Sequence, residues 1–253
     1  TIFGKTSNFD GEDFLDAIAN HPQTAKYISA KLWNYFAGEM PSKELNEALA
    51  DVFQKNGSKF KPLLCAMFRS EEFYSPHLIR NQVKSPVQWL VGTVRMLESE
   101  LPPAVVCWGL TRNLGQDLFA PPNVKGWDGG LTWITTNNLL SRYNEAIALV
   151  QGDVTALRGV VELPNPNATR LVNERLQRSR MPRVDPKRIL TEKERADKNV
   201  LIAALEKRLL QSKLKEKQRQ ALQDYLDSKG ALDDDDVLGA IRLVMSTPEY
   251  QLT

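Results

Sequence analysis

Apolar residues recur at helical spacing along most of this chain, and this pattern constrains the fold more than any other feature of the sequence. After Ser42, for example, the apolar residues fall at positions i, i+3, i+4, i+7 and i+8, which places them on one face of a helix. These residues are Leu45, Ala48, Leu49, Val52 and Phe53. Comparable stripes occur at 23–37, 60–68, 86–99, 102–114, 135–150, 191–212, 215–228 and 233–246. The sequence therefore predicts an all-α fold, a multi-helix bundle of about eight to ten helices.

Residues that cap helices stand at the starts of several of these stretches. Ser42 and Ser85 each precede a stripe, and Ser85 is followed by proline, which is favoured at the first helical position. Thr135 or Thr136 is placed to cap the long helix at 135–150. Thr191 with Glu194 has the spacing of a capping box, and the acidic run Asp233–Asp236 is suited to the start of the last helix.

One helical hairpin pattern occurs twice. The segment Ala48–Gly57 matches Ala221–Gly230 in its apolar, acidic and glycine positions. The stripe at 60–68 then corresponds to 237–245, and Ser70–Phe73 corresponds to Thr247–Tyr250. We interpret these segments as two related helical hairpins. Independent hairpins with similar patterning are the alternative, because a helical pattern alone fixes structure loosely.

Between the helical stretches lies a glycine- and tryptophan-rich segment at residues 115–134. It contains two tryptophans, four glycines, a proline pair and a lysine. Ordering such a segment costs more conformational entropy than ordering a helix, and the segment is long for a simple connection. We expect a long loop that packs across the two hairpins.

This loop contains the candidate ligand-binding residues. Trp127 and Trp133 could stack on a sugar ring or a cation, with Lys125 and Asp128 beside them and glycines that let a ligand approach the backbone. The alternative is that the indoles fill gaps between helices, and this packing role is favoured because buried aromatics mostly serve packing.

Asn138 and Arg142 extend the candidate site onto the helix that follows the loop. They stand four residues apart and so share one helix face. They could bind a carboxylate or sulfate group, or they could hydrogen-bond the loop's carbonyl groups. The second role is favoured, because irregular backbone needs hydrogen-bond partners.

The pattern also predicts a division of the chain. Residues 1–160 form a helical core that contains the loop at 115–134. Residues 161–190, rich in proline and arginine, form a linker or insertion. Residues 191–253 form a C-terminal helical segment that packs on the core.

Composition excludes several classes of function. Lys and Arg number 33 against 31 Asp and Glu, so no strong overall field favours nucleic acid. The apolar runs are too short for a membrane span. His21 and His77 lie far apart, which disfavours a metal centre, and no cofactor is expected. Cys65 and Cys107 fall within helical patterns and are predicted to be small buried thiols.

No nucleophile and base are placed together, so no catalytic residue is predicted. Paired carboxylates such as Asp10 with Glu71 or Asp117 would suit glycoside hydrolysis, but nothing in the sequence brings them together.

Several runs resemble one bacterial family. They are His21–Trp33, Phe9–Leu15, Lys84–Val87, the loop run Gly115–Gly130, Trp133–Arg142 and Met245–Leu252. These runs resemble the domain of unknown function 1800 family over nearly the whole chain, with 160–190 outside the match. The run Pro122–Trp127, which reads Pro-Asn-Val-Lys-Gly-Trp, is the most specific.

The resemblance implies a largely helical protein that is often exported from bacteria. Members are longer, with a helical amino-terminal half, so the resemblance implies that this chain is the carboxy-terminal half. Their genes often neighbour a companion family that resembles sulfatases and alkaline phosphatases. No activity is established for the family, so the resemblance supplies no catalytic residue.

The leading expectation is a non-catalytic binding or assembly module at the bacterial cell envelope, with the missing amino-terminal half and a sulfatase-like companion as partners. The alternative is part of an enzyme acting on carbohydrate or sulfated polysaccharide, with some of its site in the missing half. An enzyme predicts exposed indoles at the wall of a cleft with two carboxylates within reach. A binding module predicts buried indoles and an exposed apolar patch elsewhere.

Overall fold

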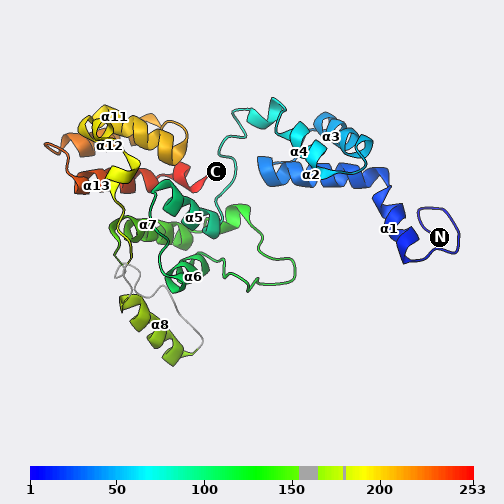
Figure 1. Ribbon diagram of the computed structural model, residues 1–253, viewed down its shortest axis with the longest axis horizontal. Coiled ribbons are helices and arrows are strands. Elements are labelled where there is room, and N and C mark those ends of the chain that lie inside the picture. Colours follow the sequence, from blue (N-terminus) through cyan, green and yellow to red (C-terminus); the bar gives the residue numbers. More distant parts are fainter. Residues whose placement is uncertain (154–164, 179–180) are drawn as a thin grey trace. The chain divides into compact units, whose positions relative to one another are not determined.

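The structure is a computed structural model that describes residues 1–153, 165–178 and 181–253 (Figure 1). The described ranges contain thirteen α-helices and no strand, which confirms the all-α class. They are α1 (Gly11–Ala19), α2 (Pro22–Ala37), α3 (Lys43–Lys55), α4 (Phe60–Met67), α5 (Pro86–Met96), α6 (Ala104–Asn113), α7 (Thr136–Gln151), α8 (Pro166–Arg178), α9 (Pro186–Ile189), α10 (Glu192–Ala196), α11 (Lys198–Leu205), α12 (Glu216–Asp227) and α13 (Asp234–Met245). Short helices such as α9 and α10 raise the number above the prediction.

Short helical turns supplement these helices. They are η1 (Glu72–Tyr74), η2 (Gly130–Trp133), the π-helical turn η4 (Glu206–Leu210) and η5 (Pro248–Gln251). Parts of the predicted proline- and arginine-rich segment, residues 154–164 and 179–180, lie outside the described residues. Among the described residues, no helix is long and apolar enough to cross a bilayer.

The chain forms two compact units, Thr1–Gln82 and Val83–Thr253. The division falls at Gln82, in the extended segment before α5, and so separates the two predicted hairpins. The predicted helical core at 1–160 is thus shared between the units, and the loop at 115–134 belongs to the second unit.

In the first unit, α3 packs against both α2 and α4. Its core centres on Trp33 of α2, Phe53 of α3, and Leu63 and Met67 of α4, all of which are buried. Burying a side chain of this size contributes on the order of 1.5–3 kcal/mol. The predicted Ser42 cap is confirmed, since its side chain accepts a hydrogen bond from the Leu45 amide.

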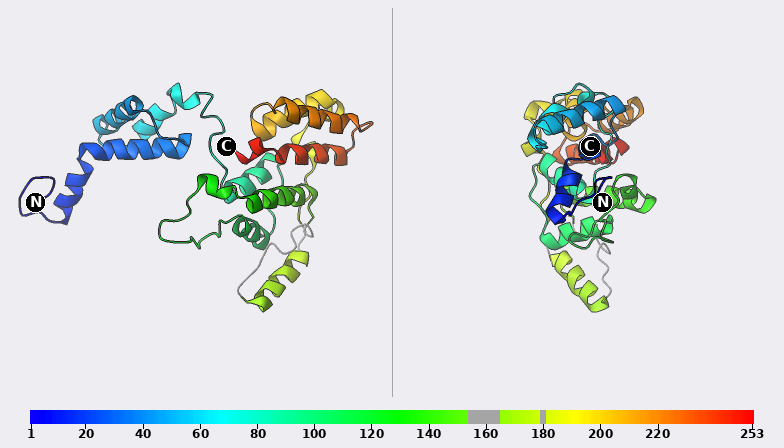
Figure 2. Two further views of the ribbon diagram at one scale, coloured as in Figure 1. Left: turned by 180° about the vertical axis from the view of Figure 1, so that it is seen from behind. Right: turned by 90° about the vertical axis from the view of Figure 1, so that its right-hand side faces the viewer.

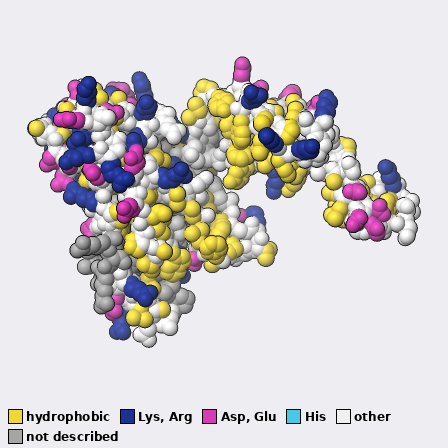
Figure 3. All heavy atoms as spheres, in the orientation of Figure 1, with side chains coloured by type: hydrophobic (Ala, Val, Ile, Leu, Met, Phe, Trp, Pro, Cys, Tyr) yellow, Lys and Arg dark blue, Asp and Glu magenta, His cyan; other side chains and the backbone are white. Residues whose placement is uncertain are grey.

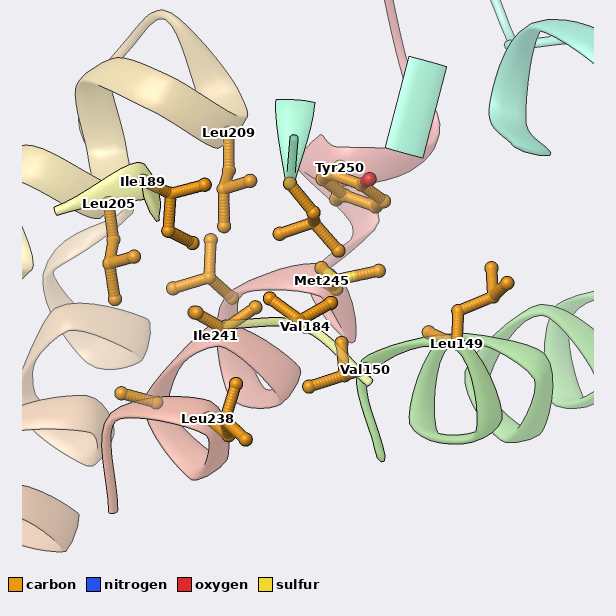
Figure 4. Packing of buried hydrophobic residues seen from close by; sticks show 14 of the residues in the cluster. Leu149, Val150, Val184, Ile189, Leu205, Leu209, Leu238, Ile241, Met245 and Tyr250 are labelled. Carbon is orange, nitrogen blue, oxygen red and sulfur yellow. The ribbon is translucent and has the colours of Figure 1, made fainter. Parts of the chain in front are cut away.

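In the second unit, α13 lies at the centre of a larger apolar core (Figure 4). It packs against α7, α9 and α12. Leu149 and Val150 of α7 approach it with Val184, while Ile189 lies beside Leu205 and Leu209 of the α11–η4 segment (Figure 4). The caps predicted at Ser85, Thr135, Thr191 and Asp233 are confirmed, because all four side chains accept a helix amide.

Both predicted hairpins are present, each followed by a 3₁₀ turn: α3–α4 with η1, and α12–α13 with η5. The structure extends the likeness by one helix. The helix before each hairpin, α2 or α11–η4, ends at a left-handed residue, Gly38 (φ 78°) or Gln211 (φ 54°). The N-cap of the next helix, Ser42 or Lys215, follows four residues after this left-handed residue in both copies. We call α2–α3–α4–η1 the first copy and α11–η4–α12–α13–η5 the second copy.

Two predictions about local structure are wrong. The helix predicted at 191–212 is interrupted, because Asp197 adopts an extended conformation and caps α11 with its side chain. Cys65, predicted to be buried, is exposed on α4, and Cys107 is half-buried. Helical periodicity alone did not show that Cys65 lies on the outer face of its helix.

Candidate binding loop and its anchor

The start of the loop at 115–134 is fixed to α6 by one carboxylate. Asp117 accepts a hydrogen bond from the Trp108 indole at 2.8 Å and pairs with the Arg112 guanidinium at 3.3 Å. Arg112 also lies over the Trp108 ring, 5.3 Å from its centroid. The neighbouring Gln116 side chain accepts a hydrogen bond from the Val87 amide at the start of α5. The first residues of the loop are therefore held by two helices.

The end of the loop is fixed by Trp133, which is 7% exposed. Its ring lies against the backbone of Gly115, where an added Cβ would stand 3.6 Å from the ring edge. Gly115 has φ 94° and Gly129 has φ 76°, conformations that favour glycine. Trp133 thus closes the base of the loop by packing its end against its beginning.

Asn138 joins the base of the loop to α7. Its side-chain amide donates to the Leu114 carbonyl at 3.2 Å, at the end of α6. Its own backbone amide donates to the Thr135 hydroxyl, which caps α7. Asn138 was expected to bind carbonyl groups of the loop; the carbonyl that it binds belongs to the C-cap of α6, one residue before the loop.

Arg142 lies one turn further along α7 and is fully buried. Its guanidinium donates to the Lys84 carbonyl at 2.7 Å and to the Gln251 side chain at 3.3 Å. Lys84 in turn donates through Nζ to the Tyr250 carbonyl at 2.7 Å, and its Nζ lies 4.1 Å from the Tyr250 ring centroid. Arg142 therefore ties α7 to the segment before α5 and to the C-terminal turn η5, rather than to the loop.

Burial perturbs the charged groups of this cluster. Desolvation, with the nearby Arg142 charge, lowers the pKa of Lys84 to about 8. Desolvation also lowers the pKa of Arg142, to about 10. Desolvation raises the pKa of Glu145 to about 8, although Asn113 donates to it at 3.1 Å. Burial makes the charged form of each of these groups costly. Such shifts occur both in structural networks and in functional sites.

The part of the loop between these anchors, residues 118–131, is called the tip. Unlike the base, it presents apolar side chains to solvent. Phe119 is 99% exposed and Leu131 is 81% exposed, while Val124 is fully exposed and Leu118 partly so. Hydrophobic side chains gather over this part of the second unit (Figure 3), and Figure 2 shows the loop between α6 and α7. Phe119 also has φ 64°, an unfavourable conformation for a bulky residue.

Local hydrogen bonds shape the tip. The Asn123 side chain accepts from the Lys125 amide at 2.9 Å, and the Gly126 amide donates to the Asn123 carbonyl. Lys125 pairs with Asp128 at 2.7 Å. The hydrogen bond between them raises the pKa of Lys125 and lowers the pKa of Asp128, so both stay charged. Trp127 between them is half-buried. The tip is therefore a hydrogen-bonded turn that exposes apolar side chains beside one ion pair.

The structure thus separates the six residues predicted for a ligand site. Trp133 and Asn138 belong to the base, Lys125, Trp127 and Asp128 belong to the tip, and Arg142 belongs to the buried cluster with Lys84. Phe119, Val124 and Leu131 were not among the predicted site residues, although apolar residues on either side of a proline pair in a loop indicate an exposed apolar tip. The loop was predicted to pack across both hairpins; within the second unit, its hydrogen bonds go to α5, α6 and α7.

Known metal-site patterns do not explain the loop. In the ranges that the structure describes, no three His, Cys, Asp or Glu side chains are grouped as metal ligands. His21 accepts from the Gln23 amide as the cap of α2, and His77 pairs with Glu39 at 3.1 Å.

A family model described as a protein of unknown function, DUF1800, matches residues 1–252. The chain belongs to this family, which confirms the resemblance seen in the sequence. The match includes residues 160–190, so the prediction that this segment lies outside it is wrong. No curated protein and no solved structure matches the chain.

Proposed function

We propose that this member of the DUF1800 family is a non-catalytic binding module that docks a partner protein through the apolar tip of its loop. The observation that carries the proposal is the exposure of Phe119, Val124 and Leu131 on a loop whose two ends are anchored. Exposed apolar groups on an ordered loop are typical of interaction sites.

The anchoring supports binding because it reduces the entropy lost on association. Asp117 holds one end of the loop and Trp133 closes the other, so the anchored ends restrict the conformations open to the tip. A preorganised loop gives up less conformational freedom when a partner binds. The left-handed backbone at Phe119 costs about 1 kcal/mol or more in the free protein. Strain that places an aromatic ring in solvent favours a functional explanation.

The charge of the tip favours a protein partner over an anionic lipid surface. Its exposed charges, Lys125 and Asp128, neutralise each other in an ion pair. Lipid-binding surfaces usually add several Lys or Arg residues to their apolar groups. A protein surface with an apolar pocket for an aromatic anchor fits the tip better.

Two features weigh against the carbohydrate-enzyme alternative. Trp133 is buried at the loop base, so it does not stand at the wall of a cleft. Asp117 and Asp128, the carboxylates of the loop, are engaged by Arg112 and Lys125. The location at the cell envelope stays a proposal that rests on the family resemblance alone. The same holds for the two partners, a sulfatase-like companion and an amino-terminal half.

Photo-cross-linking tests the docking proposal. We would place a photoreactive phenylalanine analogue at position 119 of the chain produced in its native host, with the same analogue at the exposed Lys193 as control. The proposal predicts one discrete protein adduct from position 119 and none from position 193. Excess unlabelled wild-type chain should compete for the adduct.

A matched competitor defines the site. A chain with Phe119→Ser, Val124→Ser and Leu131→Ser should compete at least about tenfold less well, because it lacks the apolar anchors. Equal competition by this variant, or adducts of equal yield from both positions, would contradict docking through the tip.

A further inference from the structure

The two copies of the helical repeat differ in what covers them, although they share their elements. In the second copy, one apolar face is fully buried within its unit (Figure 4). This face is made by Leu201, Leu205, Leu209, Ile241, Met245 and Tyr250. The positions that correspond to these in the first copy are Ile28, Leu32, Phe36, Leu64, Phe68 and Phe73. We call this second set the first-copy face.

The first-copy face keeps its apolar character but is left partly uncovered. Phe36 is 37% exposed, and the other five residues are partly buried against the Trp33 core. Tyr35 and Tyr74 flank the face at 71% and 64% exposure. Hydrophobic side chains gather visibly over the helices of this unit (Figure 3).

Aromatic rings run continuously across this face. Ring contacts link Trp33 to Phe73, Phe73 to Phe68 and Phe68 to Phe36, with centroids 4.9–5.9 Å apart. Tyr35 and Tyr74 continue the series at its two ends, against Phe36 and Phe73. Tyrosine and phenylalanine of this kind are enriched at the centres of protein interfaces.

The second copy shows what this kind of face accepts. Its α13 packs against α7, which brings Leu149 and Val150 towards Met245 (Figure 4). From α5, Thr93 forms a 2.6 Å hydrogen bond with the Tyr250 hydroxyl. Tyr250, the counterpart of Phe73, is covered completely as a result. Ile189 of α9 lies beside Leu205 and Leu209 on the rest of the face (Figure 4). Apolar side chains of neighbouring helices therefore cover this face in the second copy.

We propose that the first-copy face is a docking site for an amphipathic helix supplied by another polypeptide, which packs on it as α7 packs on Met245 in the second copy. The helix would present a stripe of Leu and Val residues at i and i+3 or i+4, the pattern by which apolar grooves recognise helices. Phe36 and Phe68 would form the centre of the contact, with Tyr35 and Tyr74 at the rim. This surface lies in the first unit and is separate from the loop of the second unit.

The test uses the full chain and a defined helix as probe. Cys65 is exposed on α4, one residue from Leu64, so an environment-sensitive dye attached there reports on the face. A Cys107→Ser background confines the dye to Cys65. The probe is a synthetic peptide of residues 135–152, which contains α7 and its caps. Its control is the same peptide with Leu149→Glu and Val150→Glu.

The proposal predicts a saturable blue shift with the α7 peptide and at least about tenfold weaker binding of the control peptide. In the chain, Phe36→Glu should weaken binding to the same degree, as should Tyr35→Glu, whose side chain is 71% exposed. The loop variant Phe119→Ser should bind as the wild type does. Unchanged unfolding midpoints check that the variants are folded.

Three results would overturn the proposal. The first is the absence of saturable binding by the α7 peptide. The second is equal binding by the control peptide or by the Phe36→Glu chain. The third is self-association of the wild-type chain that Phe36→Glu abolishes, measured by sedimentation, because the occupant would then be a second copy of this chain.

Discussion

The two copies of the helical repeat contain the same elements, but their apolar faces are covered to different degrees. In the second copy, Tyr250 is fully buried and hydrogen-bonded to Thr93 beneath α5. In the first copy, the corresponding Phe73 is only partly buried, and its neighbour Tyr74 is 64% exposed. One copy has its apolar face closed within the core of its unit, and the other has the same face only partly covered by its own unit.

An apolar stripe on a helix therefore does not by itself indicate a core. The residues of the stripe are similar in the two copies, and the presence of covering helices decides their role. The loop at 115–134 repeats the contrast on a smaller scale, with Trp133 closed within its base and Phe119 open at its tip. Substitutions on covered surfaces should therefore mainly lower stability, and substitutions on uncovered surfaces should mainly weaken association.

The largest expected effect comes from truncating the paired aromatic residues. Tyr250→Ala should lower the free energy of unfolding by about 3–5 kcal/mol, because it leaves a cavity and removes the partner of Thr93. Phe73→Ala should cost about 1–2 kcal/mol, since part of its ring already contacts water. Urea unfolding followed by circular dichroism measures both. Equal losses would break the comparison between the copies.

The loop offers a second matched pair. Trp133→Ala should cost about 3 kcal/mol, because the indole is buried between the two ends of the loop. Phe119→Ala should change stability by less than about 0.5 kcal/mol, since its ring makes little contact with the protein. Thermal unfolding of the two variants measures the difference. A loss at Phe119 as large as that at Trp133 would mean that the tip is part of the core.

The buried charged groups of the second unit, Glu145 and Lys84, predict that the stability of the protein depends on pH. The pKa of Glu145 is raised from 4.5 to about 8, so the folded state holds this proton more tightly and stability falls as pH rises between these values. The pKa of Lys84 is lowered from 10.5 to about 8, so stability recovers as pH rises from 8 towards 10.5. A stability minimum near pH 8 is expected.

Glu145→Gln should remove the fall on the acid side, which is on the order of 5 kcal/mol. The variant should therefore be more stable than the wild type at pH 8 and similar to it at pH 5. Unfolding midpoints measured from pH 5 to pH 10 decide this. A wild-type profile without a minimum would show that these charges are solvated in the folded protein.

The smallest expected effect concerns the left-handed residues that end the first helix of each copy. Gln211→Gly should stabilise the protein by about 1 kcal/mol, because glycine adopts φ 54° without steric cost. At the equivalent position, Gly38→Ala should destabilise it, since the added Cβ would stand 2.6 Å from Gln82 Cγ. Opposite signs in chemical denaturation support equivalence of the positions, and the same sign would argue against it.

Local features of this fold were readable from the sequence. Caps such as Ser42 and Thr191 were predicted because capping depends on side chains within three or four residues of each other. The repeat of the hairpins was visible for the same reason. Its extension to α2 and α11 was not, because the buried positions hold Trp33 in one copy and Glu206 in the other.

Features that depend on distant contacts were not readable. Arg142 was assigned to the loop from its spacing to Asn138, but its partners are Lys84 and Gln251, which are far away in the sequence. Cys65 lies in an apolar stretch, and only the packing of α4 shows which side faces outwards. The exposure of Phe119 likewise follows from how Asp117 and Trp133 anchor the loop.

Hydroxyl-radical footprinting of the full chain, read by mass spectrometry, tests the central claim most directly. The account predicts rapid oxidation of Phe119, Phe36 and Tyr74, and protection of Trp133, Tyr250 and Met245 until the protein is unfolded. Met245 is the strictest control, because methionine is readily oxidised whenever it is accessible. Protection of Phe119 and Tyr74 at the level of Tyr250 would contradict the distinction between covered and uncovered surfaces.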